Sequence, residues 1–581
     1  MTNSRIADIF DEIADLLEFQ GSNPFRVRAY RNGARIIRDL PEPITTVLAD
    51  DSRKLTDLDG IGKDLADKIA TLVETGELSQ HQDLLAQVPS TVLDIMRVPG
   101  LGPKKAALLY KELNIATLDQ LKAACEAEQV RQLKGFAAKT EQTILHGISI
   151  AAAANERIYW SEADTVAHDV REHLAVCQSI KQLELAGSYR RGKETVGDLD
   201  ILVVSQDAPA VMDRLAEYPE IADVIGRGDT KMSIRTHKGL QIDLRVVPAE
   251  SFGAALQYFS GSKDHNVVVR GMAKQRGLKI NEYGVFRMDG EDEAYIAGAT
   301  EQDVYATLDL PWFPPELRES RREFDWAAAG ELPELVSVDD IRGDLHMHTT
   351  ATDGRATLEE MIAAARERGL SYIAITDHSK RVSMARGLDA DRLLAQWEEI
   401  DVLNKKLDGE FLVLKGIECD ILEQGGMDLP NDVLAQADWV LASVHYGQQQ
   451  SREQITNRIL GAIENPSVTA IAHPTGRLIN RREAYEVDVD AMMTAAAKHG
   501  KLLELNANPA RLDLHDIHCA AAKSHGIPIV INTDAHSIDG LDCMRYGILQ
   551  ARRAGLTKQD VANTRTWPQL NKLIAKGRGK P

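Results

Sequence analysis

Residues 187–200 read Gly187-Ser188-Tyr189-Arg190-Arg191-Gly192-Lys193-Glu194-Thr195-Val196-Gly197-Asp198-Leu199-Asp200. Apolar runs flank this stretch, residues 183–186 before it and Ile201-Leu202-Val203-Val204 after it. The second run predicts a strand, on which Asp198 and Asp200 share a face because they are two residues apart. Two carboxylates so close repel each other unless a cation lies between them. The spacing therefore predicts a Mg²⁺ site, with Ser188 and Arg191 placed to meet substrate phosphates.

A third carboxylate comes from the run Gln241-Ile242-Asp243-Leu244-Arg245-Val246-Val247, which alternates like another strand. Three carboxylates on neighbouring strands could hold two Mg²⁺ ions, for which Mn²⁺ can substitute, and support in-line phosphoryl transfer. The plain alternative is a surface hairpin with solvated acids, since two acids at this spacing often occur by chance. The glycine and arginine turn before the pair, and Asp243 after it, favour phosphoryl transfer.

The composition indicates a large protein of several domains. The chain has 581 residues, 44% of them hydrophobic, and no apolar run of about 18 residues that would predict a membrane span. The N-terminus lacks the pattern of a signal peptide, and the five cysteines show no paired spacing, so we expect a reducing, cytoplasmic location.

The net charge of −20 disfavours binding of a polyanion by the surface as a whole, so such binding would depend on local clusters of basic residues. Residues 26–38 hold five arginines and no acid, but a solvated helix face is an alternative reading.

Two glycine hairpins between short helices predict contacts with a nucleic-acid backbone. They are Asp57-Leu58-Asp59-Gly60-Ile61-Gly62-Lys63 and Val98-Pro99-Gly100-Leu101-Gly102-Pro103-Lys104. Glycines let a backbone approach closely, and free N–H groups at the next helix bind a phosphate. One copy could be an ordinary tight turn, but two copies favour binding of DNA without sequence preference. Leu133-Lys134-Gly135-Phe136 is a weaker third candidate, because Ala137 replaces the second glycine.

The C-terminal part places imidazoles and carboxylates at the ends of apolar strands. Helical stretches alternate with the strands that we expect over residues 372–375, 412–414, 440–444, 469–472 and 529–531. This rhythm predicts a β/α barrel with ligands at the carboxyl ends of its strands. The mixture of ligands suits Zn²⁺, Mn²⁺ or Fe²⁺. The nine candidates are His346, His348, Asp353, His378, Glu418, His445, His473, Asp534 and His536.

Together these motifs resemble those of the family X DNA polymerases of the nucleotidyltransferase superfamily. The resemblance rests on GSYRRG, GDLD, QIDLRVV and Tyr258-Phe259-Ser260-Gly261-Ser262, and the chain after residue 340 resembles a PHP phosphoesterase domain. It implies a multidomain chain of α+β and α/β classes: a helical helix-hairpin-helix region, a nucleotidyltransferase palm with a thumb, and a distorted β/α barrel. We expect helical DNA-binding domains at 1–80 and 81–155, the palm at 156–248, the thumb at 249–320, a linker at 321–341 and the PHP domain at 342–581.

The resemblance also implies roles for residues of the nucleotide site. Tyr258 and Phe259 would pack on the sugar of the incoming nucleotide, where Tyr258 would crowd a 2′-hydroxyl. Gly261, Asn266 and Arg270 match residues near the nucleotide and the template strand.

A lysine in the first domain matches one that some relatives use as a Schiff-base nucleophile on abasic sugars. This lysine is Lys68, and Tyr30 and Arg26 match polar residues of the same pocket. However, Asp64 stands where vertebrate relatives carry another lysine, and an acid raises the pKa of a nearby amine, which disfavours a nucleophile. An exposed helix lysine is an equal alternative.

For the C-terminal ligands the resemblance implies three transition-metal ions (Mn²⁺, Zn²⁺ or Fe²⁺). The first would bind His346, His348 and Asp534 and share Glu418 with a second at His445 and His473, and the third would bind Asp353, His378 and His536. The implied activity is a 3′→5′ exonuclease, with abasic-site endonuclease and 3′-phosphatase as further activities. Arg477, just after His473, is a candidate phosphate contact.

We therefore expect a monomeric DNA polymerase that fills short gaps in base excision repair and trims 3′ ends. Its partners would be gapped or primer–template DNA and deoxynucleoside triphosphates, with no membrane. Two alternatives are a small-molecule phosphoesterase tethered to DNA and a non-catalytic scaffold that binds gaps. The three palm acids argue against the first, and the complete ligand sets argue against the second. We expect the two active sites to be separable by mutation and by truncation near residue 335.

Overall fold

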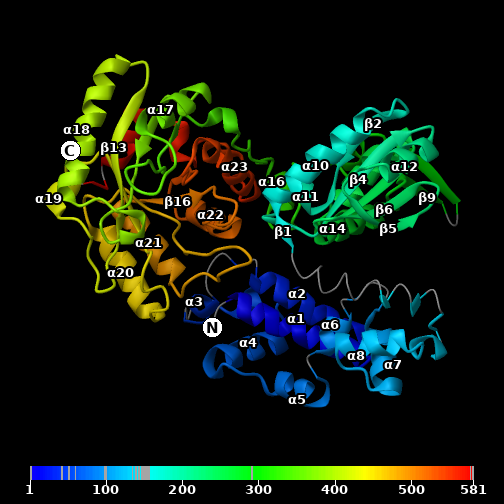
Figure 1. Ribbon diagram of the computed structural model, residues 1–581. Coiled ribbons are helices and arrows are strands. Elements are labelled where there is room, and N and C mark those ends of the chain that lie inside the picture. Colours follow the sequence, from blue (N-terminus) through cyan, green and yellow to red (C-terminus); the bar gives the residue numbers. More distant parts are fainter. Residues whose placement is uncertain are drawn as a thin grey trace. The chain divides into compact units, whose positions relative to one another are not determined.

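Figure 1 shows the computed structural model of the protein. It describes residues 3–38, 40, 44–49, 53–58, 60–89, 91–96, 98, 101–133, 135–137, 140–141, 144–145, 157–289, 292–575 and 577–578. The chain forms two compact units, Met1–Arg157 and Ile158–Pro581. Among the described residues, no helix is both long and apolar enough to cross a lipid bilayer.

The first unit is helical, as predicted. Apolar residues recur every three or four positions along the first helix and are buried against the second, where the rings of Phe10 and Tyr30 meet edge-on at 5.4 Å. The helices are α1 (Asn3–Phe19), α2 (Pro24–Arg38), α3 (Ile44–Ala49), α4 (Lys63–Thr75), α5 (Ser79–Gln87), α6 (Val92–Met96), α7 (Pro103–Leu113) and α8 (Leu118–Glu126).

The first part of the second unit contains a five-stranded sheet in the order β2-β4-β7-β6-β5 and a separate pair, β1 and β3. Leu199, Ile201 and Val203 face a core shared with α10 and α12, whereas Leu202 and Val204 pack on α13. This alternation places Leu199 on the opposite face of β4 from Asp198 and Asp200. The strands are β1 (Ile158–Tyr159), β2 (Ile180–Leu185), β3 (Thr195–Val196), β4 (Asp198–Ser205), β5 (Ile221–Arg227), β6 (Lys231–Thr236) and β7 (Gln241–Val247), and the helices are α10 (Trp160–Ala175), α11 (Gly187–Arg190) and α12 (Ala208–Ala216).

A smaller subdomain follows, built on an antiparallel sheet in the order β10-β9-β8. Its core gathers Tyr305 and Phe313 around α14 and α15. The elements are α13 (Phe252–Ser260), α14 (Lys263–Gln275), β8 (Leu278–Asn281), β9 (Gly284–Asp289), β10 (Asp292–Ala297) and α15 (Glu301–Ala306).

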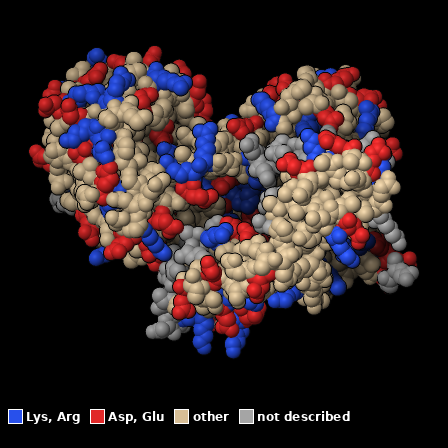
Figure 2. Space-filling view, turned by 60° about the horizontal axis from the view of Figure 1, so that its bottom comes forward, with Lys and Arg blue, Asp and Glu red and all other residues tan. Residues whose placement is uncertain are grey.

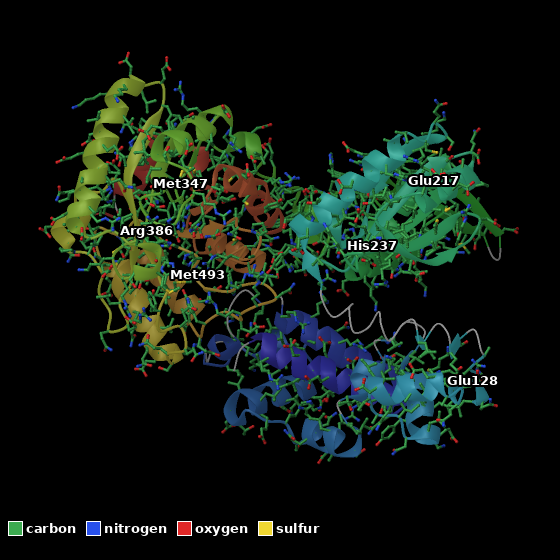
Figure 3. The ribbon with its side chains drawn as sticks, viewed as in Figure 1. Glu128, Glu217, His237, Met347, Arg386 and Met493 are labelled. Atoms are coloured by element: carbon green, nitrogen blue, oxygen red, sulfur yellow. The ribbon has the colours of Figure 1, made fainter. Side chains whose placement is uncertain are left out.

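The rest of the chain is the predicted β/α barrel. Seven parallel strands follow in chain order, and a bridge between Met347 and Ala535 joins the two ends of the sheet. Figure 3 labels Met347, which is completely buried. The strands are β11 (Gly343–Asp344), β12 (Tyr372–Ile375), β13 (Leu412–Asp420), β14 (Trp439–Ser443), β15 (Ala470–Ile471), β16 (Leu502–Asn506) and β17 (Ile529–Asn532), with helices α17 (Leu358–Glu367), α18 (Ala390–Leu407), α19 (Asn431–Leu434), α20 (Arg452–Glu464), α21 (Val489–His499), α22 (Asp516–Ser524), α23 (Met544–Arg553) and α24 (Trp567–Ala575).

Three strands differ from the sequence prediction, among them the short β11, which lies outside the expected ranges. β13 continues past Leu414 to Asp420 and carries Glu418 within the strand. β16 was not predicted, because Glu504 and Asn506 interrupt its apolar pattern; both are buried and hydrogen-bonded.

The segment expected as a linker, 321–341, packs against the barrel. It contains α16 (Glu323–Ala329), the Arg321 guanidinium lies 3.2 Å from the Asp516 carboxylate, and the Val336 N–H donates to the Leu556 carbonyl (3.0 Å). On the face of the barrel shown at the left of Figure 2, acidic and basic side chains are interspersed.

Candidate functional site

The palm acids meet on two adjacent parallel strands. Asp200 on β4 is directly opposite Asp243 on β7, and Asp198 is opposite Gln241. Burial, followed by repulsion from Asp198 and Asp243, raises the pKa of Asp200 to about 7. Asp243 accepts hydrogen bonds from Ser233 and from the Gln241 amide (2.7 Å). Such a cluster of hard oxygen ligands fits Mg²⁺, whose charge would offset the repulsion.

The turn before β4 lies against these acids. Gly187 adopts φ +65°, and a Cβ there would lie 2.6 Å from the Asp200 Oδ2 atom. A glycine is therefore needed for the turn to approach the carboxylate. The buried Ser188 Oγ has no hydrogen-bond partner within the described part of the chain. A buried hydroxyl without a partner is costly, so this oxygen suits a ligand atom such as a phosphate oxygen.

The two arginines of the turn differ in their contacts. Arg190 binds Glu301 through two hydrogen bonds (2.8 and 2.9 Å) and so joins the turn to the thumb. Arg191 donates to the Ser260 carbonyl and to Glu319 (Nε–Oε1 3.1 Å), and 12% of its side chain is exposed.

The predicted nucleotide residues gather at the end of α13. The rings of Tyr258 and Phe259 meet at 5.1 Å, and the Arg245 guanidinium lies 4.5 Å above the Phe259 ring. Asn266 is buried and donates to the Tyr258 carbonyl (2.7 Å), and Arg270 donates to the Asn266 carbonyl (3.2 Å). Gly261 ends α13 at φ +69°, a conformation that favours glycine.

All nine predicted ligands of the barrel converge at the strand ends. Glu418 lies at the centre, within 2.8–3.7 Å of five imidazoles, which belong to His346, His348, His378, His445 and His473. Three groups of donor atoms could each hold a metal ion: His348, Asp353, His378 and His536; His346, His348 and Asp534; and His378, Glu418 and His445. The third expected set is found together, with His348 in addition, and the first is found without Glu418. The second differs from the expectation, because His378 joins Glu418 and His445, whereas His473 belongs to none of the three groups.

Several donor atoms in this cluster fit metal ions better than protein partners. The buried His346 Nε2, His348 Nδ1 and Glu418 Oε2 atoms have no hydrogen-bond partner among the described residues. Burial alone would raise the pKa of Glu418, but the charges of His445 and His378 outweigh it and hold the pKa well below its usual range. His473 and Asp534 adopt φ values of 28° and 54°, which residues other than glycine adopt rarely. Imidazole and carboxylate donors in this arrangement suit transition metals.

Two carboxylates outside the predicted set orient the histidines. Glu504 accepts from His346 Nδ1 (2.7 Å), and Asp420 lies 3.0 Å from His445 Nδ1. Such contacts fix the orientation of each ring and leave Nε2 available to bind a metal ion. The signal for Asp420 was its position two residues after Glu418 on one strand. Glu504 lies on the strand that we did not predict.

The helix-hairpin-helix residues are partly described. Gly60 (φ +90°) and Gly62 precede α4, Gly102 precedes α7, and nothing lies within 4 Å of a Cβ added to Gly62 or Gly102, so a backbone could approach there. Gly100 is outside the described residues. Arg26 lies on α2, where Arg31 and Arg38 of the same basic run pair with acids of α1.

Lys68 does not have the surroundings of a free amine. It donates to Asp64 and lies 5.3 Å above the ring of Tyr30, which is itself buried and donates to Gln80. Burial lowers the pKa of Lys68, but the hydrogen bonds with Asp64 and Tyr30 outweigh it and raise the pKa above its usual value. Arg477, the candidate phosphate contact, instead donates to Glu194 (2.7 Å) and to the Leu512 carbonyl.

Known domain families match each of these parts of the chain. The chain matches a helix-hairpin-helix domain at residues 1–78, a SAM-like helix-hairpin-helix tandem at 92–148, the DNA polymerase beta palm at 157–237, the DNA polymerase beta thumb at 255–319 and the PHP domain at 344–508.

Relatives cover either the whole chain or the barrel. The DNA polymerase/3′-5′ exonuclease PolX of Bacillus subtilis (strain 168) is 40% identical over 99% of both chains. A probable phosphatase of Thermoanaerobacter sp. (strain X514) is 29% identical over 38% of this chain and 89% of its own, and one of Caldicellulosiruptor saccharolyticus is 31% identical over 33% and 79%. The chain therefore belongs to the family X DNA polymerases that carry a C-terminal PHP domain.

Proposed function

We propose that the palm adds deoxynucleotides to the 3′ end of DNA at short gaps, and that the barrel removes nucleotides from 3′ ends. The observation that carries the first activity is the pairing of Asp200 with Asp243 near the buried Ser188 hydroxyl, which has no hydrogen-bond partner among the residues that the structure describes. The Bacillus subtilis relative, named for both activities, supports the combination.

In the palm, Asp198, Asp200 and Asp243 would hold Mg²⁺. When bound, such ions offset the charge of the triphosphate and lower the pKa of the attacking 3′-hydroxyl. The Ser188 hydroxyl would donate to a phosphate oxygen, and Arg191 would neutralise phosphate charge. The new bond joins the primer oxygen to the α-phosphorus, and pyrophosphate leaves.

In the barrel, the nine ligands would hold three transition-metal ions. When bound, such ions supply a hydroxide at neutral pH and polarise a phosphodiester. Glu504 and Asp420 orient His346 and His445 for this task. A second activity, removal of a 3′-phosphate, is favoured because the relatives that match the barrel are named probable phosphatases.

One labelled, gapped DNA tests both proposals, with and without nucleotides. Asp200→Asn should abolish primer extension and leave 3′ trimming intact. His346→Ala combined with His348→Ala should lower the bound transition metal and stop trimming, while extension persists and products lengthen. Extension by the Asp200 variant at the parent rate, or trimming by the histidine variant, would contradict the assignment concerned.

A further inference from the structure

Helix α23 of the barrel holds the palm turn that carries Arg191. The Gln550 amide donates to the Gly192 carbonyl (Nε2–O 3.1 Å), and the Arg553 guanidinium donates to the Arg191 carbonyl (Nη1–O 2.8 Å). Both donors are buried. They are three residues apart on one helix and therefore share a face, from which they bind two successive carbonyls.

Arg553 also shares a carboxylate with Arg191. Glu319 accepts from Arg553 Nη1 (2.9 Å) and from Arg191 Nε (3.1 Å). Burial alone would raise the pKa of Glu319, but the charges of Arg553, Lys193 and Arg191 outweigh it and lower the pKa. The carboxylate therefore stays ionised and holds the guanidinium groups of barrel and palm together.

The fit between helix and turn is close. Gly192 adopts φ +63°, and a Cβ there would lie 3.2 Å from Leu549 Cδ2. The cavity that Trp160, Glu194 and Leu549 help to line measures about 10 Å³, roughly the space of one water molecule. The Arg477 guanidinium holds Glu194, two residues beyond Gly192. The turn cannot shift without breaking buried contacts to the barrel.

We propose that Gln550 and Arg553 are positioning residues for nucleotide addition. By binding the carbonyls of Gly192 and Arg191 and by sharing Glu319, they hold the Arg191 guanidinium where it meets the phosphates of the incoming nucleotide. This inference rests on the function proposed for the palm. It makes the barrel a structural part of the nucleotide site, although neither residue is one of the nine metal-ligand candidates.

The test measures nucleotide affinity in the full chain without turnover. The probe is a deoxynucleoside triphosphate with Mg²⁺, bound to enzyme on gapped DNA whose primer ends in a dideoxynucleotide. Loss of a charged hydrogen bond predicts about tenfold weaker affinity for Arg553→Ala, with a smaller loss for Gln550→Leu and partial recovery in Arg553→Lys. In a separate assay with an extendable primer, KM for the nucleotide should rise while kcat stays near the parent value. Arg368→Ala, which breaks a pair with Asp542 within the barrel (2.7 Å), serves as the matched control and should leave affinity unchanged.

Trimming of labelled DNA without nucleotides reports the fold of the barrel in each variant and should stay at the parent level. If Arg553→Ala does not fold, because Asp516 and Glu319 lose a buried partner, the other two variants carry the test. Parent affinity in both Gln550→Leu and Arg553→Lys would overturn the proposal, as would a parallel loss of trimming. Absence of extension by the parent protein would instead overturn the palm function, and nucleotide affinity would still decide the positioning role.

Discussion

Replacement of Glu301 by glutamine removes the charge that joins the palm turn to the thumb. The carboxylate accepts from Arg190 (2.8 and 2.9 Å), from the completely buried Arg318 (2.6 Å) and from the Trp312 indole (2.9 Å). Burial alone would raise the pKa of Glu301, but the two arginines outweigh it and lower the pKa from 4.5 to about 2. Because a tenfold change in proton affinity is worth about 1.4 kcal/mol, the charge contributes about 3 kcal/mol to stability. Glu301→Gln should lose about this amount at pH 7.

The sign of the pH dependence follows from the lowered pKa. The ionised Glu301 makes its full contribution to stability above pH 4.5, and this contribution is lost as the pH falls toward 2. The difference in the free energy of unfolding between the parent and the variant should therefore become smaller as the pH falls from 4.5 to 2. Native-state hydrogen exchange of peptides from residues 249–320 measures the local free energy of opening. Glu293→Gln is the control, because its exposed pair with Lys279 is worth at most about 1 kcal/mol. The reasoning would be refuted if Glu301→Gln lowered the local free energy of opening no more than the control does, or if the decrease did not change with pH.

Three further variants test the nucleotide site and the first domain. Tyr258→Ala should relax discrimination against ribonucleotides, because the ring would occupy the space of a 2′-hydroxyl; an unchanged ratio of incorporation rates would remove Tyr258 as the barrier. Asp64→Asn should increase borohydride trapping of the protein on a 5′-deoxyribose phosphate, because it removes the acid that raises the pKa of Lys68, and Lys68→Ala should abolish it. An adduct that survives Lys68→Ala would show that another amine reacts.

The palm could be predicted in detail because its signals are local. The alternation from Asp198 to Val204 fixes which side chains share a face, and the same period in residues 241–247 supplies Asp243. The ligand candidates of the barrel could be placed near one another for a similar reason, since most lie within four residues after the end of a short apolar strand. Strand β16 was not predicted, because its buried Glu504 and Asn506 give it the polar pattern that is typical of a surface loop.

Contacts between distant segments could not be predicted from the sequence. The position of Arg477 just after His473 predicted a phosphate contact, yet its partner is Glu194, 283 residues away in the sequence. The same holds for Arg553 and Glu319, because charge complementarity alone does not select one partner among many acids. The expected separability of the two halves assumed independent cores. However, the segment at 321–341 contacts the thumb through Glu323 and His265 and the barrel through Arg321 and Asp516, and α23 binds the palm turn.

Helix α23 is synthesised long after the palm turn that it contacts, and this order matters for a chain that is made only in part. Gln550 is added to the chain 358 residues after Gly192 of the GSYRRG turn, and Arg553 follows three residues later. A chain that stops before residue 550 therefore carries a complete set of palm acids beside a turn whose carbonyls lack these two donors. Premature termination and C-terminal proteolysis thus leave the palm without part of its support, even where they spare every acid that the palm uses.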